Sequence, residues 1–333
     1  MNWSARAIRR TAPRNLFVLD LAPRVESFES EVVAGLSRSP KTLPPKFFYD
    51  SRGAELFTAI CGTRAYYPTR TENQILQERA PEIAQAVGGD VVIIEYGAGE
   101  IDKVRRLLPS MHPSMYVGLD ISGDQLVRVS TALAADHPWL SVVAVIGDYQ
   151  SELEAELTLP EQARRIVFFP GSTVGNFEPE HARDFLRRVR SLVGDDGGIV
   201  IGVDLQKPID VLDLAYNDPQ GYTAAFNLNL LTRMNRELGA DFDVSAFAHR
   251  AFYNTERARI EMHLVSRREQ RVQVAGRRFA FAAGETIHTE SSYKYTPESF
   301  AELAREAGFS AHRLWTDPAR WFGVFFLHNA APA

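Results

Sequence analysis

Five short runs of apolar, mostly β-branched residues recur between about residues 90 and 205, and they restrict the fold more than any other feature. They are DVVIIEYGAG, MYVGLDIS, SVVAVIGDY, RRIVFFPGS and GGIVIGVDL, with helical patterns between them. Strands that alternate with helices predict a parallel sheet, and uninterrupted apolar runs suit strands buried on both faces. We therefore expect a doubly wound, mostly parallel α/β sheet of the Rossmann-like type, with ligands beyond the carboxyl ends of its strands.

The pattern changes after Asp204. A helix-rich stretch covers about 209–238, and four strand-like segments follow it, RIEMHLVS, QRVQVAG, RRFAFAAG and TIHTESSYKY. Thr296 as N-cap and Pro297 as first residue then predict a helix, and WFGVFFLHN is the last predicted strand. Residues 205–295 are therefore predicted to be an insertion into a sheet domain formed by residues 71–204 and 296–333.

Charge and cysteine content argue against several classes of protein. The 37 Lys and Arg against 42 Asp and Glu give a formal net charge of −5, which argues against nucleic-acid binding. No apolar run approaches the ~20 residues that span a bilayer, so we expect no membrane role. Cys61 is the only cysteine, which excludes an intramolecular disulfide and favours a reducing, cytoplasmic location; we expect it to be a small buried residue.

The first 16 residues are rich in arginine and contain no acidic residue. They lack the apolar centre of a secretory signal. A transit peptide is one interpretation, and a flexible arm over residues 1–17 is the one that we favour.

Polar residues and glycines follow the first three predicted strands. Gly97 and Gly99 in EYGAG allow a tight turn after the first strand, although the third glycine of a dinucleotide fingerprint is missing. Asp120 ends the second strand, where it could accept both hydroxyls of a ribose, and Asp148 and Tyr149 follow the third, where they could contact an adenine. The alternative is that both aspartates are ordinary loop caps. Together the three strand ends resemble those of S-adenosylmethionine-dependent methyltransferases, whose sheet also ends in a reversed strand.

Longer motifs point to one family within that group. FFYDSRGAELF and AYYPTRTE near the N-terminus, FFPGSTVGNF at 168–177, and AAFNLNLL and IEMHL later resemble the histidine Nα-methyltransferases of ergothioneine biosynthesis. The resemblance runs from about residue 30 to the C-terminus. It implies three methyl transfers from S-adenosylmethionine to the α-amino group of free L-histidine, through mono- and dimethyl intermediates, giving hercynine and S-adenosylhomocysteine. It also implies a second, α+β substrate-binding domain made of residues 18–70 and 205–295.

The resemblance assigns site residues to matching positions of this sequence. Cofactor contacts would fall on Tyr49, Gly97, Gly99, Lys103, Asp120, Asp148 and Tyr149. Histidine contacts would fall on Tyr66, Gly171, Asn176, Tyr216, Met262, Glu290 and Ser292. Glu100–Asp102 departs from the Ser/Thr-rich stretch that commonly precedes the lysine in this family.

These residue types suit transfer of a methyl group to a neutral amine, in which correct orientation supplies much of the rate. Tyr216 and Asn176 can hold the α-carboxylate of the amino acid by hydrogen bonds. Tyr49 or Tyr66 could orient the amine or relay its proton through water, so Tyr49, Tyr66 and Asn176 are the predicted catalytic residues. Aromatic faces also stabilise the quaternary ammonium product.

Glu290 and Ser292 are two residues apart on a predicted strand and therefore point to the same side. A carboxylate and a hydroxyl there could select the imidazole, because a site built on hydrogen bonds rejects analogues that lack them. The alternative is a surface ion pair between Glu290 and Lys294, because Lys294 and His288 share the predicted face. Met262 is either a wall of the imidazole pocket or core filling.

The eight histidines show neither an HExxH motif nor i, i+4 pairs, so we expect no metal site. Three other functions stay open: a related methyltransferase for another amino acid or amine, a nicotinamide-binding oxidoreductase, and a non-catalytic sensor of S-adenosylmethionine. We expect a monomer whose partners are small molecules.

Overall fold

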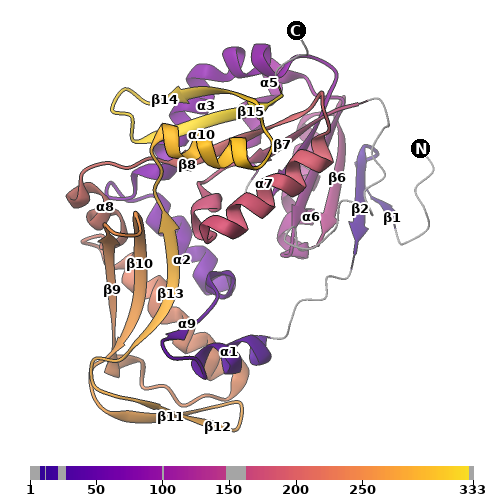
Figure 1. Cartoon of the computed structure of the whole chain (residues 1–333). Helices are drawn as coiled ribbons and strands as arrows, with labels where there is room; N and C mark the ends of the chain where they lie inside the picture. The colour runs from indigo at the N-terminus through magenta and orange to yellow at the C-terminus, as the bar shows by residue number, and fades with distance from the viewer. Residues whose placement is uncertain (1–7, 12, 22–27, 100, 148–162, 330–333) are drawn as a thin grey trace.

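The computed structural model describes residues 8–11, 13–21, 28–99, 101–147 and 163–329, which form two lobes (Figure 1). The larger lobe contains a nine-stranded sheet in the order β1-β2-β6-β5-β4-β7-β8-β15-β14. Its centre is five parallel strands, β4 (Val91–Tyr96), β5 (Met115–Asp120), β6 (Ser141–Ile146), β7 (Arg164–Phe169) and β8 (Gly198–Asp204). These strands coincide with the five apolar runs, and this confirms the predicted parallel α/β sheet.

Helices cover both faces of this sheet. On one face α7 (Pro179–Val193) and α10 (Pro297–Glu306) complete an apolar core. On the other face lie α3 (Tyr67–Val87) and α6 (Gly123–Asp136), together with two short helices. These are α4 (Asp102–Arg105) and α5 (Leu108–Met111).

The sheet ends in a reversed hairpin, as the family resemblance implies. β15 (Phe322–His328) runs antiparallel to β8, and β14 (Ala311–Thr316) runs antiparallel to β15. The preceding helix α10 begins as predicted, because the Thr296 side chain accepts from the Ser299 N–H at 3.1 Å and the Ser299 hydroxyl accepts from the Thr296 N–H at 2.9 Å.

The edge of the sheet far from this hairpin contains two strands that the sequence analysis did not predict. β2 (Leu16–Asp20) pairs in parallel with β6, and β1 (Ile8–Thr11) pairs antiparallel with β2. Residues 8–11 and 16–17, which the sequence places in a flexible arm, therefore form strands.

The smaller lobe contains a four-stranded sheet in the order β3-β13-β10-β9. Its strands are β3 (Lys41–Thr42), β13 (Thr286–Tyr293), β10 (Arg259–Ser266) and β9 (Phe247–Asn254). The helices α1 (Phe28–Leu36), α2 (Ser51–Cys61), α8 (Ile209–Tyr216) and α9 (Tyr222–Leu238) belong to the same lobe, and a hairpin of β11 (Gln270–Val274) and β12 (Arg277–Phe281) extends it.

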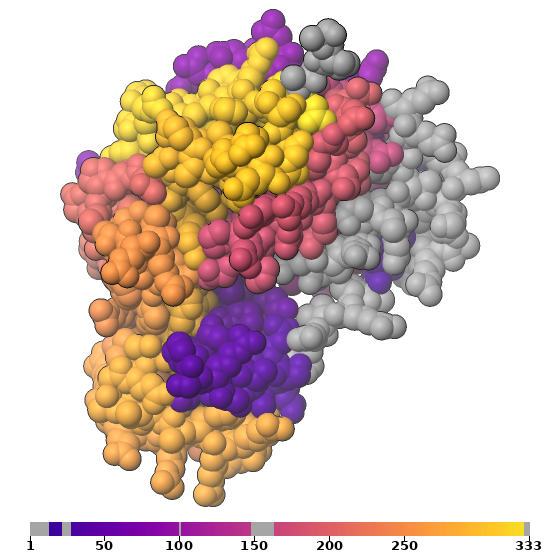
Figure 2. Space-filling view, viewed as in Figure 1, coloured from indigo at the N-terminus to yellow at the C-terminus, as the bar shows by residue number. Residues whose placement is uncertain are grey.

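Two segments far apart in the sequence share the core of the smaller lobe. Val32, Phe48 and Leu56 from the N-terminal part pack in one cluster with Leu230 and Met262 from the insertion. Figure 2 shows the N-terminal segment in indigo seated on the later residues in orange.

Cys61, expected to be buried, is partly exposed and accepts a hydrogen bond from the Thr69 hydroxyl at 3.3 Å. Among the described residues no helix is long and apolar enough to cross a membrane.

Candidate functional site

The turn after β4 brings the predicted cofactor residues of the first two strands together. Gly97 has a φ of 75°, a conformation that favours glycine, and the N–H groups of Gly97 and Ala98 both donate to the Leu119 carbonyl at 2.9 and 3.0 Å. A Cβ added at Gly99 would lie 3.2 Å from Asp120 Oδ2. The turn therefore lies directly against the acid that ends β5, which is the juxtaposition that a nucleoside site requires.

Asp120 is held in place for such a ligand. Its Oδ1 accepts from the Ser122 N–H at 2.8 Å, and Gln125 Nε2 donates to the Gly99 carbonyl at 2.7 Å, which fixes the turn. Burial raises the pKa of Asp120, opposed by hydrogen bonds from Ser122. The predicted adenine contacts, Asp148 and Tyr149, lie outside the described residues.

Lys103 and Gly171, predicted for the cofactor and for histidine, meet at a residue that the sequence analysis missed. Glu72 on α3 is 1% exposed, and both of its carboxylate oxygens accept from the Gly171 N–H at 2.9 Å. Lys103 Nζ lies 2.6 Å from Glu72 Oε2. A Cβ added at Gly202 would lie 2.1 Å from Glu72 Oε1, so the glycine on β8 leaves the space that the carboxylate occupies. One buried acid thus joins two predicted binding segments.

The loop that carries Gly171 continues into a short 3₁₀ helix, η3 (Thr173–Asn176), which packs on β13. A Cβ added at Gly175 would lie 2.8 Å from the Tyr293 carbonyl, so this close approach requires glycine. The Ser172 hydroxyl accepts from the Asp204 N–H at 2.8 Å. These contacts fix the half-buried Asn176 beside the strand that carries Glu290 and Ser292.

Aromatic side chains from the smaller lobe form the next part of the site. Tyr66 and Tyr216 approach edge to face with ring centroids 6.2 Å apart, and Phe57 lies 6.1 Å from Tyr66. Tyr49 packs against Phe57 and Phe226 at 5.6 and 5.7 Å and is 47% exposed. Burial raises the pKa of Tyr66 well above its usual value, so its phenol is neutral and does not act as a strong base.

Glu290 and Ser292 point to the same side of β13, as predicted. In the pairing of β13 with β10, Glu290 lies opposite Met262 and Ser292 lies opposite Ile260. Met262 is 1% exposed and belongs to the core. The Ser292 hydroxyl lies 3.0 Å from the Tyr216 hydroxyl. Burial raises the pKa of Glu290 to about 7, and the charge of Lys294 opposes the rise.

The alternative of a Glu290–Lys294 surface pair is wrong. Lys294 is 2% exposed, and its Nζ lies 2.8 Å from Asp204 Oδ2. The prediction that His288 shares a face of the sheet with Glu290 is wrong as well, because the register shifts between Met262 and His263. This bulge turns His288 to the opposite face of the sheet, where it pairs with His263.

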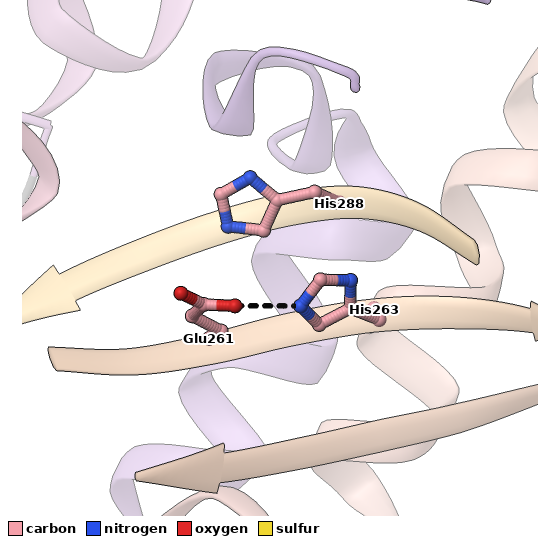
Figure 3. Close-up of side chains that lie close together, drawn as sticks. All are labelled: Glu261, His263 and His288. Atoms are coloured by element: carbon pink, nitrogen blue, oxygen red, sulfur yellow. Dashed lines mark hydrogen bonds and ion pairs between the residues drawn. The ribbon is translucent and has the colours of Figure 1, made fainter. Parts of the chain in front are cut away.

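On that opposite face Glu261, His263 and His288 lie together (Figure 3), with ligand atoms within 4.8 Å of one another. Arg259 Nε donates to Glu261 Oε1 at 2.9 Å and Arg259 Nη1 donates to Glu178 Oε1 at 2.7 Å. The guanidinium already supplies the positive charge that a metal ion would bring. We therefore interpret this group as an ion-pair network that ties β10 to the segment before α7.

Glu95 is a second residue that sequence analysis missed. It is fully buried at the end of β4, and its Oε2 accepts from the Tyr116 hydroxyl at 2.7 Å. Burial raises the pKa of Glu95 to about 8, although the hydrogen bond from Tyr116 opposes the shift. A neutral carboxylic acid therefore lies next to the glycine turn.

The strand order, the reversed hairpin and the glycine turn facing Asp120 are those of an S-adenosylmethionine-dependent methyltransferase, and comparison with known proteins agrees. A family model described as histidine-specific, S-adenosylmethionine-dependent methyltransferase matches residues 28–329. The chain belongs to this family, which confirms the resemblance of its motifs.

Individual relatives give the same result. The histidine N-alpha-methyltransferase of Mycolicibacterium smegmatis is 41% identical over 305 residues, covering 90% of this chain and 94% of that protein. The protein of the same name from Mycobacterium tuberculosis is 39% identical over 300 residues, covering 88% and 92%. Ergothioneine biosynthesis protein 1 of Neurospora crassa is 28% identical over 297 residues, covering 83% of this chain and 32% of that protein.

Proposed function

We propose that the chain transfers three methyl groups in succession to the α-amino group of free L-histidine, giving hercynine for ergothioneine biosynthesis. One observation supports this most directly. Tyr216, Ser292 and Glu290 lie next to one another in the smaller lobe. β13 packs on η3 in the loop that carries Gly171, and Glu72 connects that loop to Lys103. Groups suited to an amino acid and groups suited to a nucleoside thus border one junction between the lobes.

The cofactor residues fit a nucleoside-linked sulfonium. Gly97 and Gly99 add no side chains to the turn after β4, and Asp120 offers carboxylate oxygens beside it for ribose hydroxyls. Asp148 and Tyr149 are proposed for the adenine. When bound, S-adenosylmethionine supplies the methyl group as an electrophilic carbon on sulfur.

The protein's own residues then orient the acceptor. Asn176 and Tyr216 hold the α-carboxylate, and Tyr49 and Tyr66 surround the amine. The amine loses its proton to solvent before each transfer, with a tyrosine hydroxyl guiding it, because the raised pKa of Tyr66 keeps its phenol protonated and unable to take up that proton. With the donor bound, the amine held by these residues would take the methyl group on its lone pair, and the electron pair of the broken S–C bond would stay on sulfur.

The imidazole is recognised by Glu290 and Ser292. With a pKa of about 7, Glu290 is partly ionised near neutral pH and can accept from an imidazole N–H. Met262 is buried behind these residues and acts as an apolar wall. A hydrogen-bonded site of this type discriminates by leaving its own buried polar groups unpaired when the wrong ligand binds.

Mass spectrometry of the products tests this proposal. The purified chain, incubated with S-adenosylmethionine and L-histidine, should yield species one, two and three methyl groups heavier, with S-adenosylhomocysteine released. Methylation of another amine but not of histidine would favour a different acceptor. Cofactor binding without turnover on a panel of amino acids would favour a sensor.

Further properties belong to the same proposal. Residues 71–204 with 296–333 are proposed as the methyltransferase domain, and residues 18–70 with 205–295 as the substrate-binding domain. We also propose a cytoplasmic monomer that acts on small molecules without a metal ion and without nucleic-acid or membrane partners. Sedimentation of the purified chain measures the oligomeric state.

A further inference from the structure

Asn176, proposed to bind the α-carboxylate, is held in place by its neighbours in the chain. It is half-buried, and within the part of the chain that the structure describes its side chain makes no hydrogen bond. A side chain that is to bind a ligand in one geometry needs support from the residues around it. Gly175, Phe177 and Glu178 flank Asn176, and each makes a different contact.

Two of these neighbours hold the loop by packing. A Cβ added at Gly175 would lie 2.8 Å from the Tyr293 carbonyl, so the loop lies directly against the backbone of β13. The Phe177 ring packs on the core of the larger lobe, with its centroid 6.3 Å from that of Phe169 and 5.5 Å from that of Phe185. The residue between them therefore lies where the loop passes from one lobe to the other.

Glu178 adds a polar contact to the smaller lobe. Its Oε1 accepts from Arg259 Nη1 at 2.7 Å, and its Oε2 accepts from the Tyr293 hydroxyl at 2.6 Å. Arg259 Nη1 also donates to the Tyr293 hydroxyl oxygen at 2.9 Å, so the three side chains form a closed ring of hydrogen bonds. Arg259 and Tyr293 lie opposite each other in the pairing of β10 with β13. We refer to Glu178, Arg259 and Tyr293 as the clamp.

The part of the clamp that belongs to the smaller lobe is buried and fixed. The Arg259 side chain is 6% exposed, and its Nε and Nη2 lie 2.9 and 2.8 Å from Glu261 Oε1, which leaves Nη1 directed at the clamp. Tyr293 is 8% exposed, with its ring centroid 5.2 Å from Arg259 Cζ. The Glu178 side chain, in contrast, is 50% exposed. A rigid pair of donors therefore binds a carboxylate supplied by the loop.

The strand that carries Tyr293 also carries the residues proposed to bind the imidazole. Glu290 and Ser292 precede Tyr293 on β13. Asn176 lies between the two loop residues that contact Tyr293. The clamp therefore fixes the distance between the residue proposed for the α-carboxylate and the residues proposed for the ring.

We propose that Glu178, Arg259 and Tyr293 are positioning residues that set the spacing between the carboxylate subsite and the imidazole subsite, so that one ligand reaches both. This inference rests on the proposed function, because it takes a free amino acid with an imidazole ring as the ligand. The clamp acts through Asn176 and does not itself contact the ligand. A ligand that occupies only the imidazole subsite on β13 gains nothing from it.

Glu178→Gln tests this in the purified chain, with Glu180→Gln as the matched control, because Glu180 is an exposed residue in the first turn of the same helix. The amide keeps the size of the side chain and removes the charge that faces Arg259. Calorimetry in the presence of S-adenosylhomocysteine gives dissociation constants for L-histidine and for histamine, which keeps the imidazole and the amine but lacks the carboxylate. Circular dichroism and the affinity for S-adenosylhomocysteine report on folding.

We expect Glu178→Gln to weaken L-histidine binding about tenfold and histamine binding less than about twofold, because loss of a charge-assisted hydrogen bond affects only the ligand that bridges both subsites. Glu180→Gln should leave both affinities at the parent values. Equal losses for both ligands in Glu178→Gln, or no loss for L-histidine, would overturn the proposal. Absence of L-histidine binding in the parent chain would instead contradict the proposed function, and this inference with it.

A second measurement needs L-histidine alone. Glu178→Gln, Asn176→Ala and the double variant form a double-mutant cycle for L-histidine affinity, and Tyr293→Phe takes the place of Glu178→Gln if that variant does not fold. If the clamp acts through Asn176, most of its effect disappears once the Asn176 side chain is removed, so the double variant loses much less than the sum of the two single losses. Additive losses would overturn the proposal.

Discussion

Glu72→Gln should separate the two predicted binding segments that this buried carboxylate joins. The amide keeps one oxygen to accept from the Gly171 N–H but loses the charge that faces Lys103 Nζ at 2.6 Å. Glu72 is 1% exposed and the Lys103 side chain 18%, so solvent screens this pair weakly. A hydrogen bond between charged groups contributes about 1.5–3 kcal/mol. Loss of it would displace Lys103 from its place beside Gly171.

The affinity for S-adenosylhomocysteine measures this effect. About 1.4 kcal/mol corresponds to a tenfold change in a dissociation constant, so we expect Glu72→Gln to weaken binding roughly ten- to hundredfold by calorimetry. L-histidine affinity at saturating S-adenosylhomocysteine should change less, because the Gly171 N–H keeps its acceptor. Glu72→Ala should weaken both ligands, because it leaves that N–H without its partner.

A glycine substitution provides an independent perturbation. Gly202→Ala would place its Cβ 2.1 Å from Glu72 Oε1 and force the carboxylate to move without removing its charge. Gly89→Ala is the matched control, because nothing lies within 4 Å of the added Cβ. Wild-type cofactor affinity in both Glu72→Gln and Gly202→Ala, with folding intact, would refute the role of Glu72 in positioning Lys103.

Three more substitutions test other parts of the structure. Glu290→Ala should lower kcat/KM for L-histidine ten- to hundredfold by loss of one charge-assisted hydrogen bond of about 1.5–3 kcal/mol, and unchanged kinetics would exclude Glu290 from imidazole recognition. Glu95 has a folded-state pKa of about 8, above its ordinary value near 4.5. Between these pH values the folded state binds more protons than the unfolded state, so the free energy of unfolding falls as pH rises. Chemical denaturation should show that fall, by up to ~1.4 kcal/mol per pH unit, reduced in Glu95→Gln; equal slopes would contradict the buried acid. Thr296→Ala removes a helix cap and should cost about 1 kcal/mol in urea denaturation while kcat/KM stays at the parent value.

The central sheet could be predicted because its signal is local. Each of the strands from β4 to β8 contains a continuous apolar run, as burial on both faces requires. The start of α10 is equally local, since Thr296 and Ser299 cap each other within four residues. β14 gave no such signal, because most of its residues are not buried.

The site was less predictable, because its partners are distant in the sequence. Glu72 lies 99 residues from Gly171, and Lys294 is buried only because β8 delivers Asp204 to it. A bulge on β13 turned His288 to the opposite face, and alternation along a strand cannot reveal one extra residue. Positions of single side chains in the predicted pocket followed from the family motifs and not from the physics of local patterns.

The two halves of the junction differ in charge, and the difference matches the proposed ligands. On the cofactor side Glu72 neutralises Lys103, so no net positive charge is set against a sulfonium. On the amino-acid side Asp204 faces both Lys207 and Lys294, and Asp317 also acts on Lys207. The Lys294 ammonium contacts the Tyr216 and Ser292 hydroxyls there. The neutral phenols of Tyr66 and Tyr216 lie close to that side, where an amine must become a quaternary ammonium. This placement of charge fits the proposed orientation of the zwitterion, with its carboxylate toward Tyr216 and its nitrogen toward the methyl donor.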